Sequence, residues 1–288
     1  MNVWFALLLT VLSWAASFHL ARFTVGVMTP NSAIIARFAL ASMLLLPLAS
    51  HCERWNWRLL WQHRWVLLFL GAIGIGVFQI GMFYGLQSST ASNAALIMAF
   101  NPALTTGLSA MADRRPVGAL QLAGLILGLA GVVVVVSHGQ WSTLAHLAFA
   151  RGDLLLIASG AAWSIYSVVL QRRVTGLSVL QVTASTIAIC VLTLWLAAAL
   201  VMPTTLQWPP AQTWPALAFM GVVGSGLAYV WWNHAVTRVG AARASMFMNL
   251  IPVFTMLMGL PLGETLLASQ LIGAALVIAG VWLATRSG

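Results

Sequence analysis

Residues 121–132 read QLAGLILGLAGV, and residues 270–281 read QLIGAALVIAGV. Placed one over the other, at a separation of 149 residues, the two stretches share Gln, Leu, Gly, Leu, Ala, Gly and Val at the same positions. Both are almost entirely apolar and lack the alternation expected of a strand in a membrane barrel. The chain is therefore expected to contain an internal repeat whose units are built from membrane-spanning helices.

Other residues recur at nearly the same separation and extend the repeat over the whole chain. The recurring pairs are Trp14 with Trp163 at 149 residues and Pro102 with Pro252 at 150 residues. The first copy is expected at residues 3–137 and the second at residues 152–285. Each copy has room for five spans, an odd number, so the second copy must enter the membrane in the opposite orientation. We predict an all-α integral membrane protein with ten transmembrane helices arranged as two inverted five-helix repeats.

The composition supports a membrane protein independently of the repeat. Hydrophobic residues make up 61% of the 288 residues, and charged residues only 6%. A soluble domain carries about 25% charged residues, so a soluble enzyme, a nucleic-acid-binding module and a disordered chain are excluded. A membrane-spanning helix needs about 20 residues, so ten spans and short loops use the whole length. The expected helices are 3–25, 31–50, 66–87, 91–111, 118–137, 152–171, 178–201, 214–236, 240–260 and 268–285.

The arginines predict the orientation of the helices. The net charge of +9 comes from 13 basic residues, all arginine, against four acidic ones, and we assign it to loops that orient the spans. With the N-terminus in the cytoplasm, most arginines fall on that side, while Arg22, Arg37 and Arg151 fall on the other. The positive-inside bias then predicts a multi-pass protein of the inner (plasma) membrane with both termini in the cytoplasm.

The end of each copy carries a family resemblance. Residues 110–135 read AMADRRPVGALQLAGLILGLAGVVVV, and residues 260–284 read LPLGETLLASQLIGAALVIAGVWLA. With the LGE before the last helix and a tryptophan inside the first helix of each copy, they resemble the EamA domains of the drug/metabolite transporter superfamily. The first copy departs from this pattern, because it has Ala112–Asp113 where the second has Gly263–Glu264.

The resemblance covers residues 3–285 and implies a function. Members of this superfamily are mostly exporters of small metabolites in bacterial inner membranes. The helix faces that bear tryptophan and tyrosine are most similar to those expected of aromatic amino-acid exporters. Alternating access would come from rocking of helix groups around a central site. The expected partners are a small-molecule substrate and the lipid bilayer, with no nucleic acid and no cofactor, and the protein is expected to be a monomer or a homodimer.

Polar and aromatic residues inside the predicted spans form the candidate site, because polar groups inside a bilayer face the bundle interior. Several share one helix face, for example Trp163, Tyr166 and Ser167, and a lipid-facing surface has no use for such a stripe. A dry seam of interhelical hydrogen bonds is the alternative interpretation. The candidate substrate-binding residues are Trp14, Ser17, His19, Gln79, Tyr84, Asn101, Trp163, Tyr166, Tyr229, Trp232, Asn233, His234 and Asn249, and the expected helix kinks are Pro102 and Pro252.

The acidic residues limit the substrate class. None of the four falls in the interior of a predicted span, because all lie in loops or at helix starts. The site is therefore expected to suit organic cations poorly and to offer no buried carboxylate for proton coupling. We therefore expect small neutral or zwitterionic substrates, above all amino acids, aromatic ones included. Another metabolite class, such as a small drug-like or nucleobase solute, is the alternative.

A remote alternative is an intramembrane serine hydrolase that would use Ser225 with His234. These residues are nine positions apart and have no acid as a third member, so we do not expect an enzyme. No His, Cys or Asp cluster has the spacing of a metal site, and we expect no metal. Gly124 and Gly128 form a GxxxG pattern, which marks the fifth helix, like the tenth, as a packing or dimer-forming element.

Overall fold

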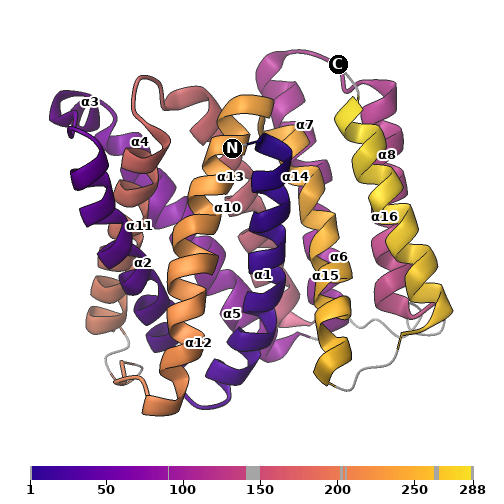
Figure 1. Ribbon diagram of the computed structural model, residues 1–288, viewed down its shortest axis with the longest axis horizontal. Coiled ribbons are helices and arrows are strands. Elements are labelled where there is room, and N and C mark those ends of the chain that lie inside the picture. The colour runs from indigo at the N-terminus through magenta and orange to yellow at the C-terminus, as the bar shows by residue number, and fades with distance from the viewer. Residues whose placement is uncertain are drawn as a thin grey trace.

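The computed structural model describes residues 2–89, 91–140, 150–201, 204, 206–262 and 266–286. Over these residues every regular element is a helix, and ten helical segments are long and apolar enough to cross a membrane. Figure 1 shows the segments packed side by side as one bundle, with both ends of the chain on the same side. The predicted all-α membrane fold is confirmed.

The first half of the chain supplies five of the spans. The first and second are α1 (Val3–Val25) and α2 (Pro30–Cys52), and the short helix α3 (Trp57–Gln62) follows them. The third is the continuous run of α4 (Arg64–Leu68), η1 (Phe69–Val77) and α5 (Phe78–Ser88). The fourth consists of α6 (Ala91–Ala99) and α7 (Asn101–Asp113), and the fifth is α8 (Ala119–Ser137).

The second half repeats this order. Its first two spans are α10 (Arg151–Arg173) and α11 (Val179–Val201). The third is the run of η3 (Ala211–Thr213), α12 (Trp214–Phe219), η4 (Met220–Leu227) and α13 (Ala228–Val239). The fourth comprises α14 (Ala241–Met246), η5 (Phe247–Asn249) and α15 (Leu250–Gly259), with η6 (Leu260–Leu262) at its end, and the fifth is α16 (Ala268–Arg286). Since five is an odd number, the second half starts from the side of the bundle opposite to the first.

The lengths of the helices suit a bilayer. α1, α2, α10 and α11 have 23 residues each. At a rise of 1.5 Å per residue, such a helix is about 35 Å long, which exceeds the roughly 30 Å of hydrocarbon that it has to cross. Each of these helices therefore spans the membrane once, and its centre lies near the midplane.

The third span of each half contains a π-helical segment, η1 or η4, with the same Gly-x-x-Gly-x-Gly pattern at residues 71–76 and 221–226. π-Helical turns are rare and occur often at functional sites. In this bundle the glycines permit close helix contacts. A Cβ on Gly221 would lie 2.7 Å from the carbonyl oxygen of Arg37, and a Cβ on Gly71 would lie 2.6 Å from that of Thr186. The two halves thus pack in the same way, with α2 on η4 and α11 on η1.

The fifth spans of the two halves, α8 and α16, lie against each other at one end of the bundle, on the right of Figure 1. Glycines remove the side chains at their contact. A Cβ on Gly124 would lie 2.6 Å from the carbonyl oxygen of Gly280, and a Cβ on Gly131 would lie 2.6 Å from that of Gly273. The small residues that predicted a packing element are therefore used within the chain, between its two halves.

The fourth span of each half is interrupted near its proline. α6 ends at Ala99, and Pro102 is the second residue of α7. In the second half the 3₁₀ turn η5 separates α14 from α15, of which Pro252 is the third residue. A proline has no N–H for the preceding turn and its ring crowds that turn, so the regular helix is broken there. Both interruptions thus occur at equivalent places.

Candidate functional site

Seven aromatic side chains meet in the centre of the bundle. Trp163 stacks on Tyr166 with ring centroids 5.2 Å apart, and it contacts Trp14 edge to face at 5.3 Å and Tyr229 edge to face at 5.5 Å. These separations are typical of favourable aromatic packing. The rings come from α1, α2, α5, α10 and α13. We call Trp14, Phe38, Phe78, Trp163, Tyr166, Tyr229 and Trp232 the central aromatic cluster.

Five of these seven residues are among the candidates that the sequence predicted, and the structure brings them together from three helices. Phe38 and Phe78 were missed, because one more phenylalanine in an apolar helix carries no signal of its own. Five of the seven rings are buried, and Trp163 is only 1% exposed, whereas Trp14 and Phe78 are half-buried. In this conformation they pack directly against one another and occupy the centre of the bundle.

The cluster lies on the symmetry axis of the repeat. Trp14 and Trp163 are at equivalent positions of the two halves, since they are 149 residues apart and each is near the middle of the first span. Equivalent residues can touch only where they lie next to the axis that relates the halves. Their edge-to-face contact at 5.3 Å therefore places the cluster on the pseudo-twofold axis, close to the midplane.

Polar candidates surround the rings and bond to them. The hydroxyl of Tyr166 donates to Oδ1 of Asn233 at 2.9 Å, and Nδ2 of Asn233 donates to Oγ1 of Thr183 at 2.9 Å. Nε2 of Gln79 donates to the hydroxyl oxygen of Tyr229 at 3.2 Å. Gln79 and Asn233 are thus held in place by neighbouring helices, and they fix the two tyrosines of the cluster.

The three indole N–H groups of the cluster differ in their hydrogen bonding. Nε1 of Trp14 donates to the carbonyl oxygen of Gly224 at 3.0 Å, within the π-helical segment η4. The indole N–H groups of Trp163 and Trp232 are buried and have no acceptor in the described part of the chain. A buried donor without an acceptor is unfavourable by about 1–3 kcal/mol. The centre of the bundle therefore has two hydrogen-bond donors to offer.

Two further candidates lie next to the cluster. A Cβ on Gly224 would lie 2.5 Å from the hydroxyl oxygen of Ser17, so α1 meets η4 at this serine. A Cβ on Gly160 would lie 2.2 Å from Oδ1 of Asn101, so the buried Asn101 packs against α10 one turn before Trp163. Ser17 thus lies where α1 approaches η4, and Asn101 lies where α7 approaches α10.

The remaining candidates are not part of this group. Nε2 of His19 lies 3.0 Å from the carbonyl oxygen of Thr255 in α15. Asn249 packs against α8, since its Nδ2 would lie 2.8 Å from a Cβ on Gly128. Tyr84 and His234 are half-buried and make no ring contact with the cluster among the residues described. The structure thus separates these four from the central aromatic cluster.

The most important residue that the sequence analysis misplaced is Arg37. We counted its charge among those on the outer side that orient the spans, although it falls within the expected helix 31–50. In the structure it lies in α2, seven residues after the start of the helix, and is only 6% exposed. Its Nε donates to the hydroxyl oxygen of Ser225 at 2.9 Å, and its guanidinium carbon lies 5.1 Å from the centre of the Phe38 ring. The position of Arg37 within a long apolar run was the signal that could have identified it.

The proposed hydrolase pair is not formed. Ser225 is fully buried, and its hydroxyl oxygen accepts a hydrogen bond from Arg37. No hydrogen bond joins it to His234 in the described part of the chain. A nucleophilic serine needs a base within hydrogen-bond reach, and this one is held by a cation instead. Ser225 therefore serves to position Arg37.

Polar contacts hold both ends of α10. At its N-terminal end the buried Asp153 accepts hydrogen bonds from the backbone N–H of Ala150 at 2.8 Å, from Asn93 at 2.9 Å and from the Ser89 hydroxyl. The first of these is the helix-capping contact typical of an acidic residue in the first turn. Ser89 directly follows the third span and Asn93 is in the first turn of the fourth, so these contacts join α10 to both spans on one side of the bundle.

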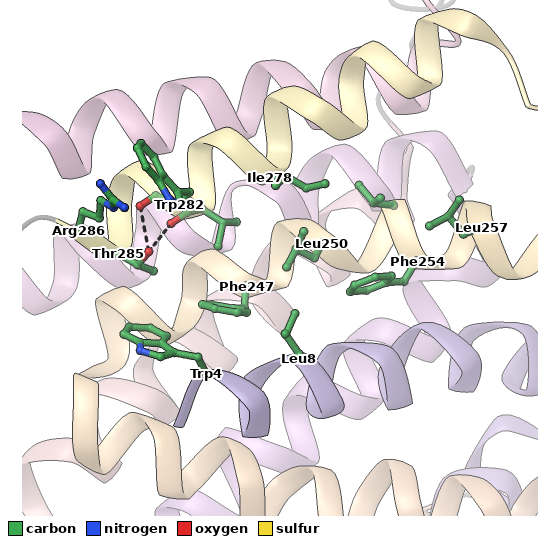
Figure 2. Close-up of a pocket in the computed structure, with 12 residues that line it drawn as sticks. Trp4, Leu8, Phe247, Leu250, Phe254, Leu257, Ile278, Trp282, Thr285 and Arg286 are labelled. Carbon is green, nitrogen blue, oxygen red and sulfur yellow. Dashed lines mark hydrogen bonds between the residues drawn. The ribbon is translucent and has the colours of Figure 1, made fainter. Parts of the chain in front are cut away.

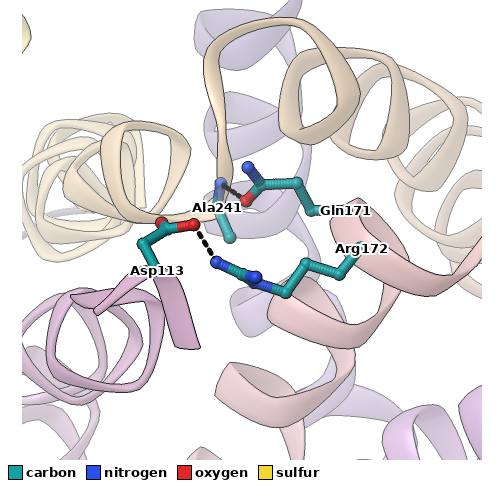
Figure 3. Close-up of polar contacts among 4 residues, drawn as sticks. All are labelled: Asp113, Gln171, Arg172 and Ala241. Atoms are coloured by element: carbon teal, nitrogen blue, oxygen red, sulfur yellow. Dashed lines mark hydrogen bonds and ion pairs between the residues drawn. The ribbon is translucent and has the colours of Figure 1, made fainter. Parts of the chain in front are cut away.

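At the opposite end of α10, Arg172 pairs with Asp113 of α7, and Oε1 of Gln171 accepts a hydrogen bond from the backbone N–H of Ala241 at 2.8 Å. Figure 3 shows these contacts joining three helices, α7, α10 and α14. Glu53, at the end of α2, accepts a hydrogen bond from Ser178. Glu264 lies outside the described residues.

An apolar groove of about 580 Å³ lies away from the cluster, between α1, α15 and α16. Figure 2 shows Trp4, Leu8 and Phe247 along one side, and Trp282 and Arg286 at one end. None of the candidate residues lines this groove. It is lined by apolar side chains of α1, η5, α15 and α16 and opens outward, where lipid is expected.

The chain matches the EamA-like transporter family twice, over residues 2–137 and over residues 150–286. It is 33% identical over 286 residues to the uncharacterized transporter YyaM of Bacillus subtilis, with 99% of this chain and 94% of that protein covered. A crystal structure that is 22% identical in sequence covers 97% of this chain and 95% of its own, with a TM-score of 0.79. This last likeness shows a shared fold.

Two other relatives have names that state a substrate. The chain is 25% identical to a probable terminal-alkyne amino-acid exporter of Streptantibioticus cattleyicolor, with 99% of this chain and 93% of that protein covered. It is 27% identical to an S-adenosylmethionine/S-adenosylhomocysteine transporter of Chlamydia trachomatis, with 96% and 86% covered. Family and relatives agree in describing transporters, not enzymes. The chain therefore belongs to the EamA-like transporter family and is a multi-pass membrane transporter of small metabolites.

Proposed function

We propose that this transporter exports amino acids, aromatic ones included, across the bacterial inner membrane. The observation that carries the proposal is the central aromatic cluster on the pseudo-twofold axis near the midplane, where transporters built from inverted repeats bind their substrates. Indole and phenol rings offer flat apolar faces to a substrate ring. They also attract an ammonium group, by about 0.5–2 kcal/mol. The relative named as an amino-acid exporter gives the proposal additional support.

Access to the cluster would alternate between the two sides. α10 carries Trp163 and Tyr166 at its centre and polar contacts at both ends. The Asp153 contacts act as the outer gate and the Arg172–Asp113 pair acts as the cytoplasmic gate. In a rocking motion one gate opens while the other stays closed, and the packed rings separate enough to admit the substrate. In the present conformation both sets of contacts are formed.

The test is transport by the purified protein in proteoliposomes. Radiolabelled phenylalanine, tryptophan or leucine should enter by counterflow into vesicles that are preloaded with the unlabelled amino acid. Trp163→Phe, which keeps a ring but removes the indole, should reduce counterflow, whereas the exposed tryptophan Trp195 of α11 provides the matched control Trp195→Phe. Absence of counterflow with every amino acid, in a sample that is folded by circular dichroism, would refute amino-acid export.

A second candidate is a solute that bears a nucleobase. The relative named as an S-adenosylmethionine/S-adenosylhomocysteine transporter favours it, and a purine ring would stack on the same aromatic faces. The same vesicles decide between the two classes. Counterflow is measured with labelled phenylalanine and with labelled adenosine, each in vesicles preloaded with the same unlabelled solute. The class that shows counterflow is the transported one.

A further inference from the structure

We infer that Arg37 binds the carboxylate of the transported solute, so that the substrates of this protein are aromatic or apolar molecules that carry a carboxylate. The inference rests on the proposed function for the location of the site, and it adds the chemical group that the site recognises. The sequence predicted neutral or zwitterionic substrates and a candidate site without arginine. The present inference narrows this class to solutes with a carboxylate.

Arg37 lies beside the central aromatic cluster. Its Nε donates to Ser225, which follows Gly224, the residue whose carbonyl oxygen accepts the hydrogen bond of Trp14. Its guanidinium carbon lies 5.1 Å from the centre of the Phe38 ring. Phe38 and Tyr229 are members of the central aromatic cluster, with ring centroids 5.8 Å apart. The buried positive charge is thus at the edge of the cluster.

None of the described acidic residues serves as a counter-ion for Arg37. The described acidic residues are all engaged elsewhere: Glu53 with Ser178, Asp113 with Arg172, and Asp153 with Ser89 and Asn93. Apart from the bond to Ser225, Arg37 makes no hydrogen bond in the described part of the chain. An ionised group in a low-dielectric interior is costly unless it is paired. The missing partner of this arginine is therefore an anion that enters from outside.

The guanidinium of Arg37 and the donors around it suit a carboxylate. The guanidinium fork matches a carboxylate with two parallel hydrogen bonds, and Arg remains charged in proteins. The indole N–H groups of Trp163 and Trp232 add two buried donors without acceptors among the residues described. Ser225 and Trp232 are seven residues apart on one span, about two turns, so both lie on the same face of it. A solute with its carboxylate at Arg37 would thus have its ring on the side of the tryptophans.

The experiment compares solutes that differ only in the carboxylate. The four solutes are phenylalanine, phenylalaninamide, phenethylamine and phenylpropionate. Their binding to the purified protein in nanodiscs is measured by tryptophan fluorescence, and their inhibition of counterflow is measured in vesicles. The wild-type protein should bind the two carboxylates about 10- to 100-fold more tightly than the amide or the amine, as expected of a charge-assisted hydrogen bond. Arg37→Gln should bring this ratio close to one, and Arg37→Lys should retain part of it.

Two further variants control for folding and for loss of a positive charge in general. Arg22→Gln removes an exposed arginine of α1 and should leave the ratio of carboxylate to amide affinity unchanged. Ser225→Ala removes only the hydroxyl that holds Nε of Arg37, and should lower the ratio by a smaller factor than Arg37→Gln. If Arg37→Gln does not fold, the ratio in the wild-type protein and in Ser225→Ala decides the question.

The outcomes separate this inference from the proposed function. Equal affinity for phenylalanine and its amide, or an unchanged ratio in Arg37→Gln, overturns the role of Arg37 while amino-acid export stands. Arg37-dependent transport of phenylpropionate without transport of phenylalanine supports the role of Arg37 and refutes amino-acid export. Failure of both carboxylates to bind overturns the inference as well.

Discussion

Gln79 and Tyr229 occupy equivalent positions in the two halves of the protein, 150 residues apart, and are hydrogen-bonded to each other over 3.2 Å. Like the contact between Trp14 and Trp163, this bond crosses the pseudo-twofold axis. A point on this axis stays in place when the two halves exchange conformations. Residues there can therefore meet the same substrate in the inward- and outward-facing states, although one half supplies an amide and the other a phenol.

The bond across the axis should show a measurable coupling. Tyr229→Phe and Gln79→Leu each remove one partner, and the double variant completes a mutant cycle in detergent unfolding. We expect a coupling free energy of about 0.6 kcal/mol and at most about 1.7 kcal/mol, as for other hydrogen bonds between membrane helices. The matched control is Tyr84→Phe, since Tyr84 is on the same helix as Gln79 but outside the cluster. A coupling of zero between Gln79 and Tyr229 would contradict the bond.

Trp163 should be as important for stability as for transport. Because its side chain is 1% exposed and contacts most of the cluster, Trp163→Ala should lower the free energy of unfolding by about 3–5 kcal/mol. Trp195→Ala, at an exposed position of α11, should change it by less than about 0.5 kcal/mol. Thermal unfolding of both variants in the same detergent is the measurement. Equal shifts would show that the cluster is not a packed core.

The glycines between α8 and α16 should tolerate no side chain. Gly124→Ala places a Cβ 2.6 Å from the carbonyl oxygen of Gly280, so the helices must move apart, at a cost of about 1–3 kcal/mol. Gly107 has no atom within 4 Å of such a Cβ, and Gly107→Ala should be neutral or slightly stabilising. The melting temperatures of the two variants test this difference. A stable Gly124→Ala protein would argue against the contact.

The pair of Arg172 and Asp113 should set the balance between conformations more than the stability of the fold. Both side chains are partly exposed, so the pair contributes about 1 kcal/mol or less. Arg172→Asp should change the initial transport rate by about 5-fold or less. Adding Asp113→Arg in the same molecule should restore it. Arg115→Asp, at a nearby exposed arginine, serves as the control for charge. No rescue in the double variant would exclude a gating role for the pair.

The orientation in the membrane should follow the arginines. Arg37 is buried and no longer counts as a loop charge. More arginines still lie on the side of the termini than on the other side, so both termini should be cytoplasmic. A C-terminal fusion to a reporter that is active only in the cytoplasm should be active. A C-terminal alkaline phosphatase fusion should be inactive. The reverse pattern would invert the orientation, and the Asp153 contacts would then form the cytoplasmic gate.

The sequence by itself determined the ten spans, the two-copy plan and most of the aromatic cluster. These features depend on local properties: the length of an apolar run, the helical spacing of residues such as Trp163 and Tyr166, and the recurrence of one pattern in both halves. The repeat of Gly-x-x-Gly-x-Gly at 71–76 and 221–226 was also visible in the sequence, and it could have identified the third span as the place of closest packing.

Only the tertiary structure decided which of the polar residues meet. His19 and Asn249 have the same character as Gln79, yet they face α15 and α8, because the direction of a side chain depends on how its helix is rotated and which helix lies next to it. Arg37 was visible as an ionisable residue inside a predicted span, but its neighbours were not. Hydropathy averages over a whole span, and one arginine in 23 residues does not alter that average. Its significance arises from Gly221, which lets α2 approach η4 until the guanidinium reaches Ser225 beside the aromatic rings.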